Sequence, residues 1–390
     1  MGLRRTLAVV AGLYVIEGLP MGIFTDVWGI YLREAGFGLA LIGALSGLRI
    51  AWAAKALWSP LVDRFGERQQ WIAGALLVMA AALAAMPFVD PSSNLRWLWG
   101  ILGIFCLAAA TQDIAIDAYT IAIVDRGQEG PANAVRITGY RVALLLAGGG
   151  LPLLPRWIGW QGTHQVAALV FVGLAAALLA APRAGVAVDR RRDVRGAFRS
   201  WVNRPHLVSV LLFVLLFRIS DLAMAPMLKP FWVDAGLSRE EIALVSTSVG
   251  FFATLAGAAA GGWIVAKVGI GRGLWIAGVF AVGSNLGYAA TAFLGGGRPG
   301  IYAASLAESF CGGLAAASFM SFLMRICDRD HAAVQYATLT GLYALPGTLA
   351  GVASGWVAEH FGYGICFAAT AIVAIPAFFF LPRARRWSGD

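Results

Sequence analysis

Twelve long apolar stretches run through this chain, and they constrain its fold more than any other feature. They lie at residues 7–31, 38–61, 70–88, 96–123, 132–154, 161–181, 207–231, 241–264, 273–294, 300–324, 332–358 and 362–381. A membrane-spanning helix needs about 20 mostly apolar residues, which these stretches supply. Because they lack the alternation of apolar and polar residues that barrel strands require, we predict an all-α membrane protein with twelve transmembrane helices.

The composition supports a lipid environment. Hydrophobic residues make up 59% of the chain and charged residues 13%, whereas a soluble domain carries about 25% charged residues. The formal net charge of +9 is compatible with nucleic-acid binding, but the basic residues fall in the short segments between apolar stretches. Basic residues there act as topology signals. We therefore expect the lipid bilayer, and no nucleic acid, as a partner.

Lysine and arginine are distributed unevenly over the loops. Nineteen fall in one alternate set of loops, and six, including Lys229, fall in the other. Because cytoplasmic loops carry the excess of basic residues, the first set and both termini are predicted to be cytoplasmic. The first apolar stretch continues to Tyr31 without a small-residue cleavage site, which favours a membrane span over a signal peptide. We expect a multi-pass protein of the bacterial inner membrane.

The two halves of the chain resemble each other. Residues 34–37 (EAGF) recur as 234–237 (DAGL), residues 181–183 (APR) recur as 381–383 (LPR), and residues 61–66 (LVDRFG) are echoed by 264–269 (IVAKVG). We predict two pseudo-symmetric six-helix bundles at 1–182 and 207–390, joined by an Arg-rich cytoplasmic linker at 183–206. In secondary transporters, repeats of this kind enclose a solute cavity near the midplane.

Several ionisable residues fall inside the apolar stretches, where each charge costs at least about 2.5 kcal/mol. Asp113 and Asp117 are four residues apart and share one helix face. At 1.5 Å per residue, Arg136 on the next helix matches Asp117 in depth, and Arg141 matches Asp113. Two interpretations stay open: fixed salt bridges lock the two helices, or one carboxylate exchanges a proton or solute for its arginine during transport.

Glu17 is the strongest single candidate for a proton site. It lies about eleven residues into the first helix, next to Pro20, which frees a backbone carbonyl and favours a kink. Arg49 on the second helix matches its depth. The alternative is therefore a fixed ion pair between Glu17 and Arg49.

The second half carries fewer buried charges. Arg218 and Asp221 are three residues apart on one helix, so they either neutralise each other or bind the solute. Glu308 has no partner at a suitable spacing, which makes it a further candidate for proton coupling. Lys55, within two turns of a helix end, is expected only to extend its amine to the interface.

No sequence pattern indicates catalysis. The four cysteines form no CxxC pair, no nucleotide-binding GxxxxGK[ST] motif is present, and no histidine is predicted at mid-depth. An intramembrane hydrolase would need a base or metal ligands beside a nucleophile. We therefore expect no enzyme, no cofactor and no metal site.

Four motifs resemble a known family. Residues 57–66 (LWSPLVDRFG) are similar to the loop 2–3 signature of the major facilitator superfamily, which implies that Asp63 and Arg64 gate the cytoplasmic side. Residues 110–119 (ATQDIAIDAY), 139–141 (GYR) and 335–337 (QYA) resemble the AmpG-like branch. That branch includes muropeptide, acetyl-CoA and siderophore permeases. Muropeptide permeases of this type commonly carry extra helices, which favours a compact member such as a siderophore permease.

The resemblance implies proton-coupled import of a mid-sized polar solute of the siderophore or muropeptide class by alternating access, in a monomeric protein. Proton coupling is assigned to Glu17, Asp113, Asp117 and Glu308. The expected cavity residues are Arg49, Gln112, Arg136, Tyr140, Arg141, Arg218 and Asp221. The alternatives are a receptor or sensor with the same fold, and an exporter or antiporter of a small molecule.

Overall fold

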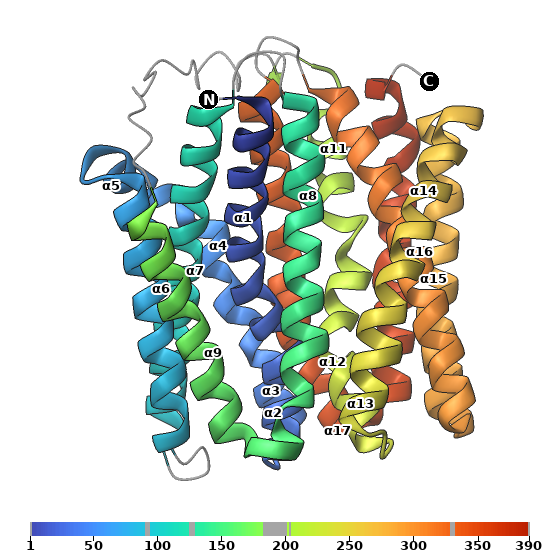
Figure 1. Ribbon diagram of the computed structural model, residues 1–390. Coiled ribbons are helices and arrows are strands. Elements are labelled where there is room, and N and C mark those ends of the chain that lie inside the picture. Colours follow the sequence, from blue (N-terminus) through green and yellow to red (C-terminus); the bar gives the residue numbers. More distant parts are fainter. Residues whose placement is uncertain are drawn as a thin grey trace. The chain divides into compact units, whose positions relative to one another are not determined.

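Helices account for most of the residues that the computed structural model describes, which are 2–89, 94–124, 129–181, 201–202, 204–327 and 332–388. No strand occurs in these ranges. Most of the linker predicted at 183–206 lies outside the described residues. Within each part of the chain, long helices lie side by side and alternate in direction (Figure 1).

Nine helical segments among the described residues are long and apolar enough to cross a membrane. They are Leu3–Glu34, Arg68–Phe88, Leu95–Thr120, Pro155–Ala180, Leu207–Asp234, Arg239–Val268, Ile270–Leu294, Gly297–Ile326 and Thr338–Trp387. The last is a pair of helices that meet at Gly362, where φ is 82°. Two interrupted spans, at 39–64 and 129–153, complete the twelve that the sequence predicts.

The two interrupted spans are not continuous α-helices. They contain 3-10 turns, which are wound more tightly than an α-helix, and the second also contains a π-helical turn, which is wound more loosely. The first consists of α3 (Leu39–Ala44), a 3-10 turn (Leu45–Arg49), α4 (Ile50–Ala54), a 3-10 turn (Lys55–Leu57) and α5 (Ser59–Arg64). The second consists of α8 (Glu129–Leu145), a π-helical turn (Leu146–Gly150) and a 3-10 turn (Leu151–Leu153). Because 3-10 and π turns differ from 3.6 residues per turn, they rotate the side chains that follow them.

The first compact unit comprises residues 1–35 and 48–189. Besides α4, α5 and α8, it contains α1 (Leu3–Gly22), a π-helical turn (Ile23–Val27), α2 (Trp28–Glu34), α6 (Arg68–Ala85), α7 (Leu95–Ile123) and α9 (Pro155–Ala180). Helix α1 packs on both α7 and α8. A Cβ atom on Gly18 would lie 2.6 Å from the carbonyl oxygen of Tyr140, so glycine permits the close approach of α1 and α8.

The second compact unit comprises residues 36–47 and 190–390. It contains α3, α11 (Leu207–Leu216), α12 (Ile219–Asp234), α13 (Arg239–Glu241), a π-helix (Ile242–Val249), α14 (Gly250–Val268), α15 (Ile270–Leu294), α16 (Gly297–Ile326) and α17 (Ala332–Ser388). A side chain on Gly257 or Gly313 would collide with the backbone of the facing helix, so α14 and α16 approach closely there. Buried aromatic rings, including Phe213 and Phe319, fill part of the core.

Helix α3 packs against α17 within the second unit. The Ala40 backbone N–H donates a hydrogen bond to Oε2 of Glu359 at 2.6 Å. A Cβ atom on Gly43 would lie 2.6 Å from the Cα atom of Gly355, so paired glycines bring the two backbones together. An acidic side chain at the start of a helix also compensates its unpaired N–H groups.

Three pairs of glycines with positive φ repeat through the chain. They are Gly36 and Gly236, Gly66 and Gly269, and Gly159 and Gly362, separated by 200, 203 and 203 residues. Side chains other than glycine rarely adopt this conformation. The first two pairs fall within the sequence repeats, so the backbone repeats together with the sequence, as expected for two pseudo-symmetric halves.

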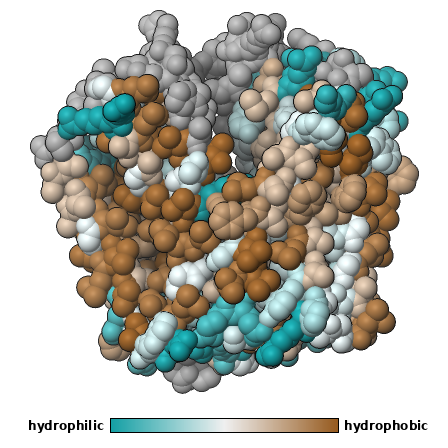
Figure 2. All heavy atoms as spheres, turned by 45° about the vertical axis from the view of Figure 1, so that its right-hand side comes forward, coloured by the Kyte–Doolittle hydropathy of each residue, from teal (hydrophilic) through white to brown (hydrophobic). Residues whose placement is uncertain are grey.

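The surface carries the polarity expected of a protein in a bilayer. On the face shown in Figure 2, hydrophobic side chains cover the middle, and hydrophilic side chains gather toward the lower edge and the upper corners. Many large apolar side chains are exposed, among them Leu169, Phe252 and Leu349. Exposing apolar side chains to lipid tails carries no free-energy penalty, unlike exposing them to water.

Candidate functional site

Asp117 on α7 joins three helices of the first unit. Its Oδ1 atom accepts a hydrogen bond from the Tyr14 hydroxyl of α1 at 2.7 Å and another from Nη2 of Arg136 of α8 at 2.9 Å. The Arg136 guanidinium also lies over the Tyr14 ring, 4.6 Å from its centroid. Charge-assisted hydrogen bonds are stronger than neutral ones, so Asp117 holds α1, α7 and α8 at one depth.

Lys55 connects the second span to the same cluster. Its Nζ atom lies 3.6 Å from Oδ2 of Asp113 and 3.9 Å from Oδ2 of Asp117. Lys55 begins the 3-10 turn Lys55–Leu57, and its side chain is 32% exposed against 13% for Asp113. The sequence pattern does not predict this ion pair, because it indicates that Lys55 extends its amine to the interface. The interrupted helix turns it toward α7.

Glu17 belongs to the cluster through α1, one turn after Tyr14. Its Oε2 atom is buried and has no hydrogen-bond partner among the described residues. The charges that act on Glu17 are those of Asp113, Asp117, Lys55 and Arg136. Arg49, its predicted partner, lies at the end of the 3-10 turn Leu45–Arg49.

The cluster contains more acidic than basic groups. Glu17, Asp113 and Asp117 face Lys55 and Arg136. Taken by themselves, these five groups carry one net negative charge when all of them are ionised. An uncompensated charge inside a membrane protein is costly, and a single bound proton would remove it.

One of the two predicted helix 4–5 ion pairs is confirmed and the other is wrong. Asp117 pairs with Arg136, but Asp113 pairs with Lys55, and Arg141 forms no ion pair with Asp113 in the part of the chain described. The prediction pairs residues by their depth in the membrane and does not consider how each helix is rotated about its own axis. Residues 136 and 141 are five apart, which places them about 140° apart around a helix, whereas residues 113 and 117 share a face.

The other predicted cavity residues of the first unit differ in their surroundings. Gln112 is fully buried; its Nε2 atom donates to the Ile16 carbonyl at 3.5 Å. Tyr140 is half-buried, and its carbonyl oxygen faces Gly18. Arg141 and Arg49 are also half-buried. A direct role of these residues in solute binding stays a prediction.

In the second unit, Arg218 and Asp221 pair with each other. Nε of Arg218 lies 3.2 Å from Oδ2 of Asp221, and its Nη1 atom donates to the Gly312 carbonyl of α16 at 3.0 Å. Glu308 accepts a hydrogen bond from the Ser309 hydroxyl at 3.4 Å. The charges that act on Glu308 are those of Asp221, Arg218 and Lys229, so these four charged residues form a second cluster.

Lys229 is a buried residue of α12. The count of basic residues in the loops treats it as a loop residue, and that assignment is wrong. Its exposed fraction is 8%. Its Nζ atom donates to Oγ of Ser246 at 2.8 Å and to Oγ1 of Thr247 at 3.0 Å. Helix α12 continues to Asp234. The apolar stretch predicted at 207–231 already contains Lys229, so the lysine should not be counted as a loop charge; the hydroxyl groups of Ser246 and Thr247 solvate it inside the span.

The predicted gating residues Asp63 and Arg64 lie in α5, between Pro60 and the turn at Gly66. The structure describes their backbone but not their side chains. Their gating role therefore remains a prediction from the loop signature.

Twelve spans in two repeated halves, with charged groups buried within each unit, are the architecture of multi-pass secondary transporters. The sequence model of the Major Facilitator Superfamily matches residues 8–351. The chain belongs to this superfamily.

Curated relatives place the chain near one branch. The "Anhydromuropeptide permease" of Escherichia coli K12 is 28% identical over 376 residues, which cover 94% of this chain and 77% of the permease. The "Putative transporter AmpG 4" of Rickettsia conorii is 27% identical over 389 residues, which cover 94% of this chain and 93% of that protein. The resemblance to AmpG-like permeases is thus confirmed.

Solved structures share the fold. A bacterial homologue of the human lysosomal transporter Spinster, in an inward-facing and unoccupied conformation, superposes with a TM-score of 0.79 at 15% identity and covers 99% of this chain and 97% of its own. The nucleoside transporter NupG superposes with a TM-score of 0.73 at 16% identity, and the match covers 98% of this chain and 99% of that one. The predicted major facilitator fold is confirmed.

Proposed function

We propose that this secondary transporter imports a mid-sized polar solute together with protons, and that the solute belongs to the anhydromuropeptide class. The observation that carries the proposal is the cluster around Asp117, in which three carboxylates face two cations. The similarity to the anhydromuropeptide permease of Escherichia coli supports the solute class. A siderophore-class solute is the alternative that the experiment below separates.

The cluster suits coupling because protonation and ion pairing compete in it. While the carboxylates are ionised, Lys55 and Arg136 bind them and tie α7 to α8 and to the second span. When one carboxylate takes a proton, its partner cation loses part of its attraction. A change in protonation would thus weaken contacts between helices and shift the balance between conformations.

The residues of the second cluster provide complementary chemistry for a solute. Arg218 and Lys229 carry positive charge in α12 and its entry, and carboxylates of a peptide-bearing solute require such partners. Within this proposal, Arg49 and Arg141 of the first unit provide further cations, and Glu308 provides a second proton site. Asp63 and Arg64 are assigned to the cytoplasmic gate.

The orientation in this proposal follows from the loop charges. Both termini and the Arg-rich linker at 183–206 lie on the cytoplasmic side, because that side carries most of the lysines and arginines. The bundles at 1–182 and 207–390 move against each other around the solute. A monomer contains all the elements that this cycle requires.

The test is solute uptake by proteoliposomes that contain the purified protein. Vesicles are given an inward proton gradient, and the entry of a labelled anhydromuropeptide is compared with that of a labelled siderophore. The proposal predicts muropeptide uptake that rises with the gradient and falls when a protonophore is added. Muropeptide uptake that ignores the gradient would refute proton coupling. Siderophore uptake alone would change the solute class, and no uptake of any solute would favour a receptor.

A further inference from the structure

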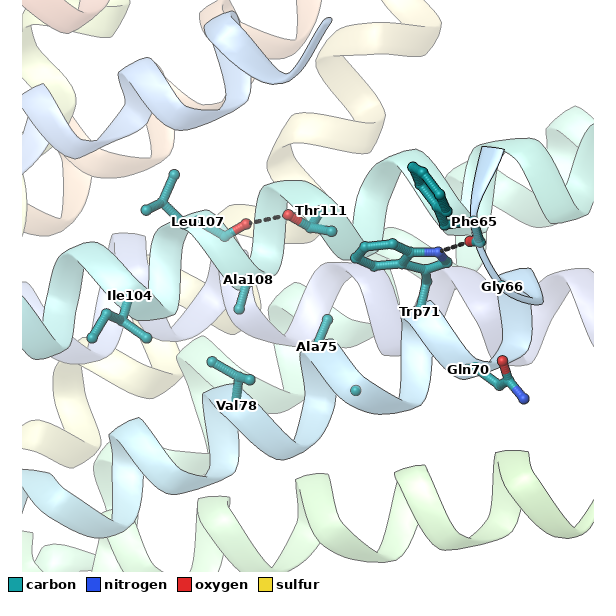
Figure 3. Close-up of a pocket in the computed structure, with 11 residues that line it drawn as sticks. Phe65, Gly66, Gln70, Trp71, Ala75, Val78, Ile104, Leu107, Ala108 and Thr111 are labelled. Carbon is teal, nitrogen blue, oxygen red and sulfur yellow. Dashed lines mark hydrogen bonds between the residues drawn. The ribbon is translucent and has the colours of Figure 1, made fainter. Parts of the chain in front are cut away.

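A groove on the membrane-facing side of the first unit lies between α6 and α7. Its volume is about 640 Å³. Figure 3 shows Trp71, Ala75 and Val78 along α6, opposite Ile104 and other side chains of α7. Phe65 and Gly66, in the turn before α6, close one end. From residue 71 to residue 78 the groove follows α6 for about 10 Å.

The walls belong to helices that cross the membrane. Both α6 and α7 fall within candidate membrane spans. Ile104 and Leu107, on the α7 wall, are 52% and 51% exposed, so the groove is open toward the surroundings of the helices. In a bilayer those surroundings are lipid tails. Most of the side chains that line the groove are apolar, so hydrocarbon would occupy it more favourably than water.

Three polar groups along the groove have partners within the chain. The Trp71 indole N–H donates to the Phe65 carbonyl, as Figure 3 shows. The Thr111 hydroxyl donates to the Leu107 carbonyl at 2.8 Å. The Gln70 side-chain oxygen accepts from the Glu67 backbone N–H at 3.3 Å. An occupant therefore needs no hydrogen-bonding groups, which favours a hydrocarbon chain over a polar solute.

The groove is also connected to the second span. The Trp58 indole N–H donates to the Thr111 hydroxyl at 3.1 Å, and Thr111 lines the groove. Trp58 follows directly after the 3-10 turn that begins with Lys55, whose amine pairs with Asp113. An occupant of the groove that packs on Thr111 would support α7. Through the Trp58 hydrogen bond, it would also support the segment of the second span that contains Lys55.

We infer that this groove binds one acyl chain of a membrane phospholipid, which packs between α6 and α7 beside the turn at Gly66. The hydrocarbon chain fills the apolar volume, and the headgroup stays at the level of the turn. Bound lipid fixes the α7 wall and, through Thr111 and Trp58, the segment that carries Lys55.

The experiment uses the full chain in phosphatidylethanolamine vesicles that contain a small fraction of phosphatidylethanolamine with a photoactivatable diazirine in one acyl chain. Labelled peptides are mapped by mass spectrometry. We expect labelling concentrated on residues 65–78 and 104–111. Equal labelling of these residues and of the exposed face at Leu169 would refute the inference.

Gly74 offers a variant that fills the groove with little risk to folding. It lines the groove, and a Cβ atom there meets no atom within 4 Å. Leucine is also a better helix former than glycine. We expect Gly74→Leu to lose labelling of the groove peptides about tenfold, as when a side chain displaces two methylene groups of an acyl chain.

The matched control is Gly100→Leu on α7. Gly100 is exposed and equally open, but it does not line the groove, so labelling should stay at the wild-type level. A second filling variant, Val78→Trp, should reproduce the loss, which keeps the test decisive if Gly74→Leu does not fold. Unchanged labelling in a folded filling variant overturns the inference.

Discussion

The two units place their buried charges in different ways. In the first unit, Asp117 binds partners from three other elements: Tyr14 of α1, Lys55 of the second span and Arg136 of α8. In the second unit, the Arg218–Asp221 pair lies within one turn of one helix. Ion pairs between helices depend on how the helices sit, whereas a pair within one turn persists when helices move.

This difference assigns different work to the two clusters. A change in the charge of Asp117 or Asp113 alters contacts that hold several helices together. A change at Asp221 alters mainly its own helix, although Arg218 also reaches the Gly312 carbonyl of α16. Within the proposed function, we expect the first unit to couple protonation to helix movement and the second unit to bind the solute. The predictions below test this division.

The largest effect is expected for Asp117→Asn. Asparagine keeps an oxygen that can accept the Tyr14 hydrogen bond, so folding should lose only about 1 kcal/mol. The lost charge, however, leaves Arg136 and Lys55 with a weakened partner. We expect the initial rate of solute uptake to fall at least about tenfold, the factor that about 1.4 kcal/mol produces. Uptake is measured in proteoliposomes, and thermal unfolding in detergent reports folding.

A double variant distinguishes coupling from simple support. Asp117→Asn with Arg136→Gln removes both charges of the pair. If the pair only braces the helices, the double variant should recover full uptake, because no unpaired charge remains. If Asp117 takes part in coupling, uptake stays low. Full recovery would thus end the proposed role of Asp117 in transport.

A smaller but specific effect is expected for Lys55→Met. The change removes the cation that bridges Asp113 and Asp117, and it leaves a stem of similar shape. We expect uptake to fall several-fold and to respond less to the proton gradient. Lys55→Arg should retain most of both, because it keeps the charge.

Lys229→Met in the second unit is the comparison for Lys55→Met. Lys229 contacts the hydroxyls of Ser246 and Thr247, so its loss should raise the solute concentration needed for half-maximal uptake and leave the response to the gradient unchanged. If the two lysine variants change the same quantity, the division between coupling and binding is wrong.

The fold could be predicted almost completely from the sequence. Apolar length determines the number of spans, and the repeated glycines mark equivalent helix ends, such as Gly36 and Gly236. Depth could be predicted too, because each helical residue advances by a fixed rise. The pair between Asp117 and Arg136 was found in this way.

Helix rotation could not be predicted. Tyr14 and Lys55 were missed as partners of Asp117, and Arg141 was wrongly paired with Asp113. Depth says nothing about which face a residue occupies. The 3-10 turns in the second span add a further rotation that no apolar pattern reveals. The spacing of residues 136 and 141, five apart, was the available sign that both arginines could not share one face.

Glu17→Gln is expected to change pH dependence more than rate. Glutamine imitates the protonated acid, so the cluster of the first unit loses its excess negative charge. Uptake should continue at a reduced rate, but it should no longer rise as the outside is acidified. The measurement is uptake over a series of external pH values at a fixed internal pH. A profile identical to that of the wild type removes Glu17 from the proton path.

The smallest effect is expected for Asp221→Asn. Asparagine keeps an oxygen beside the Arg218 guanidinium, and Arg218 keeps its hydrogen bond to the Gly312 carbonyl, so the guanidinium is not left without polar partners. Uptake should therefore fall no more than about twofold, the factor that corresponds to about 0.5 kcal/mol, with an unchanged response to the proton gradient. A loss as large as that of Asp117→Asn would show that the second unit takes an equal part in coupling. It would then not matter for proton coupling whether an ion pair lies within one helix or joins two helices.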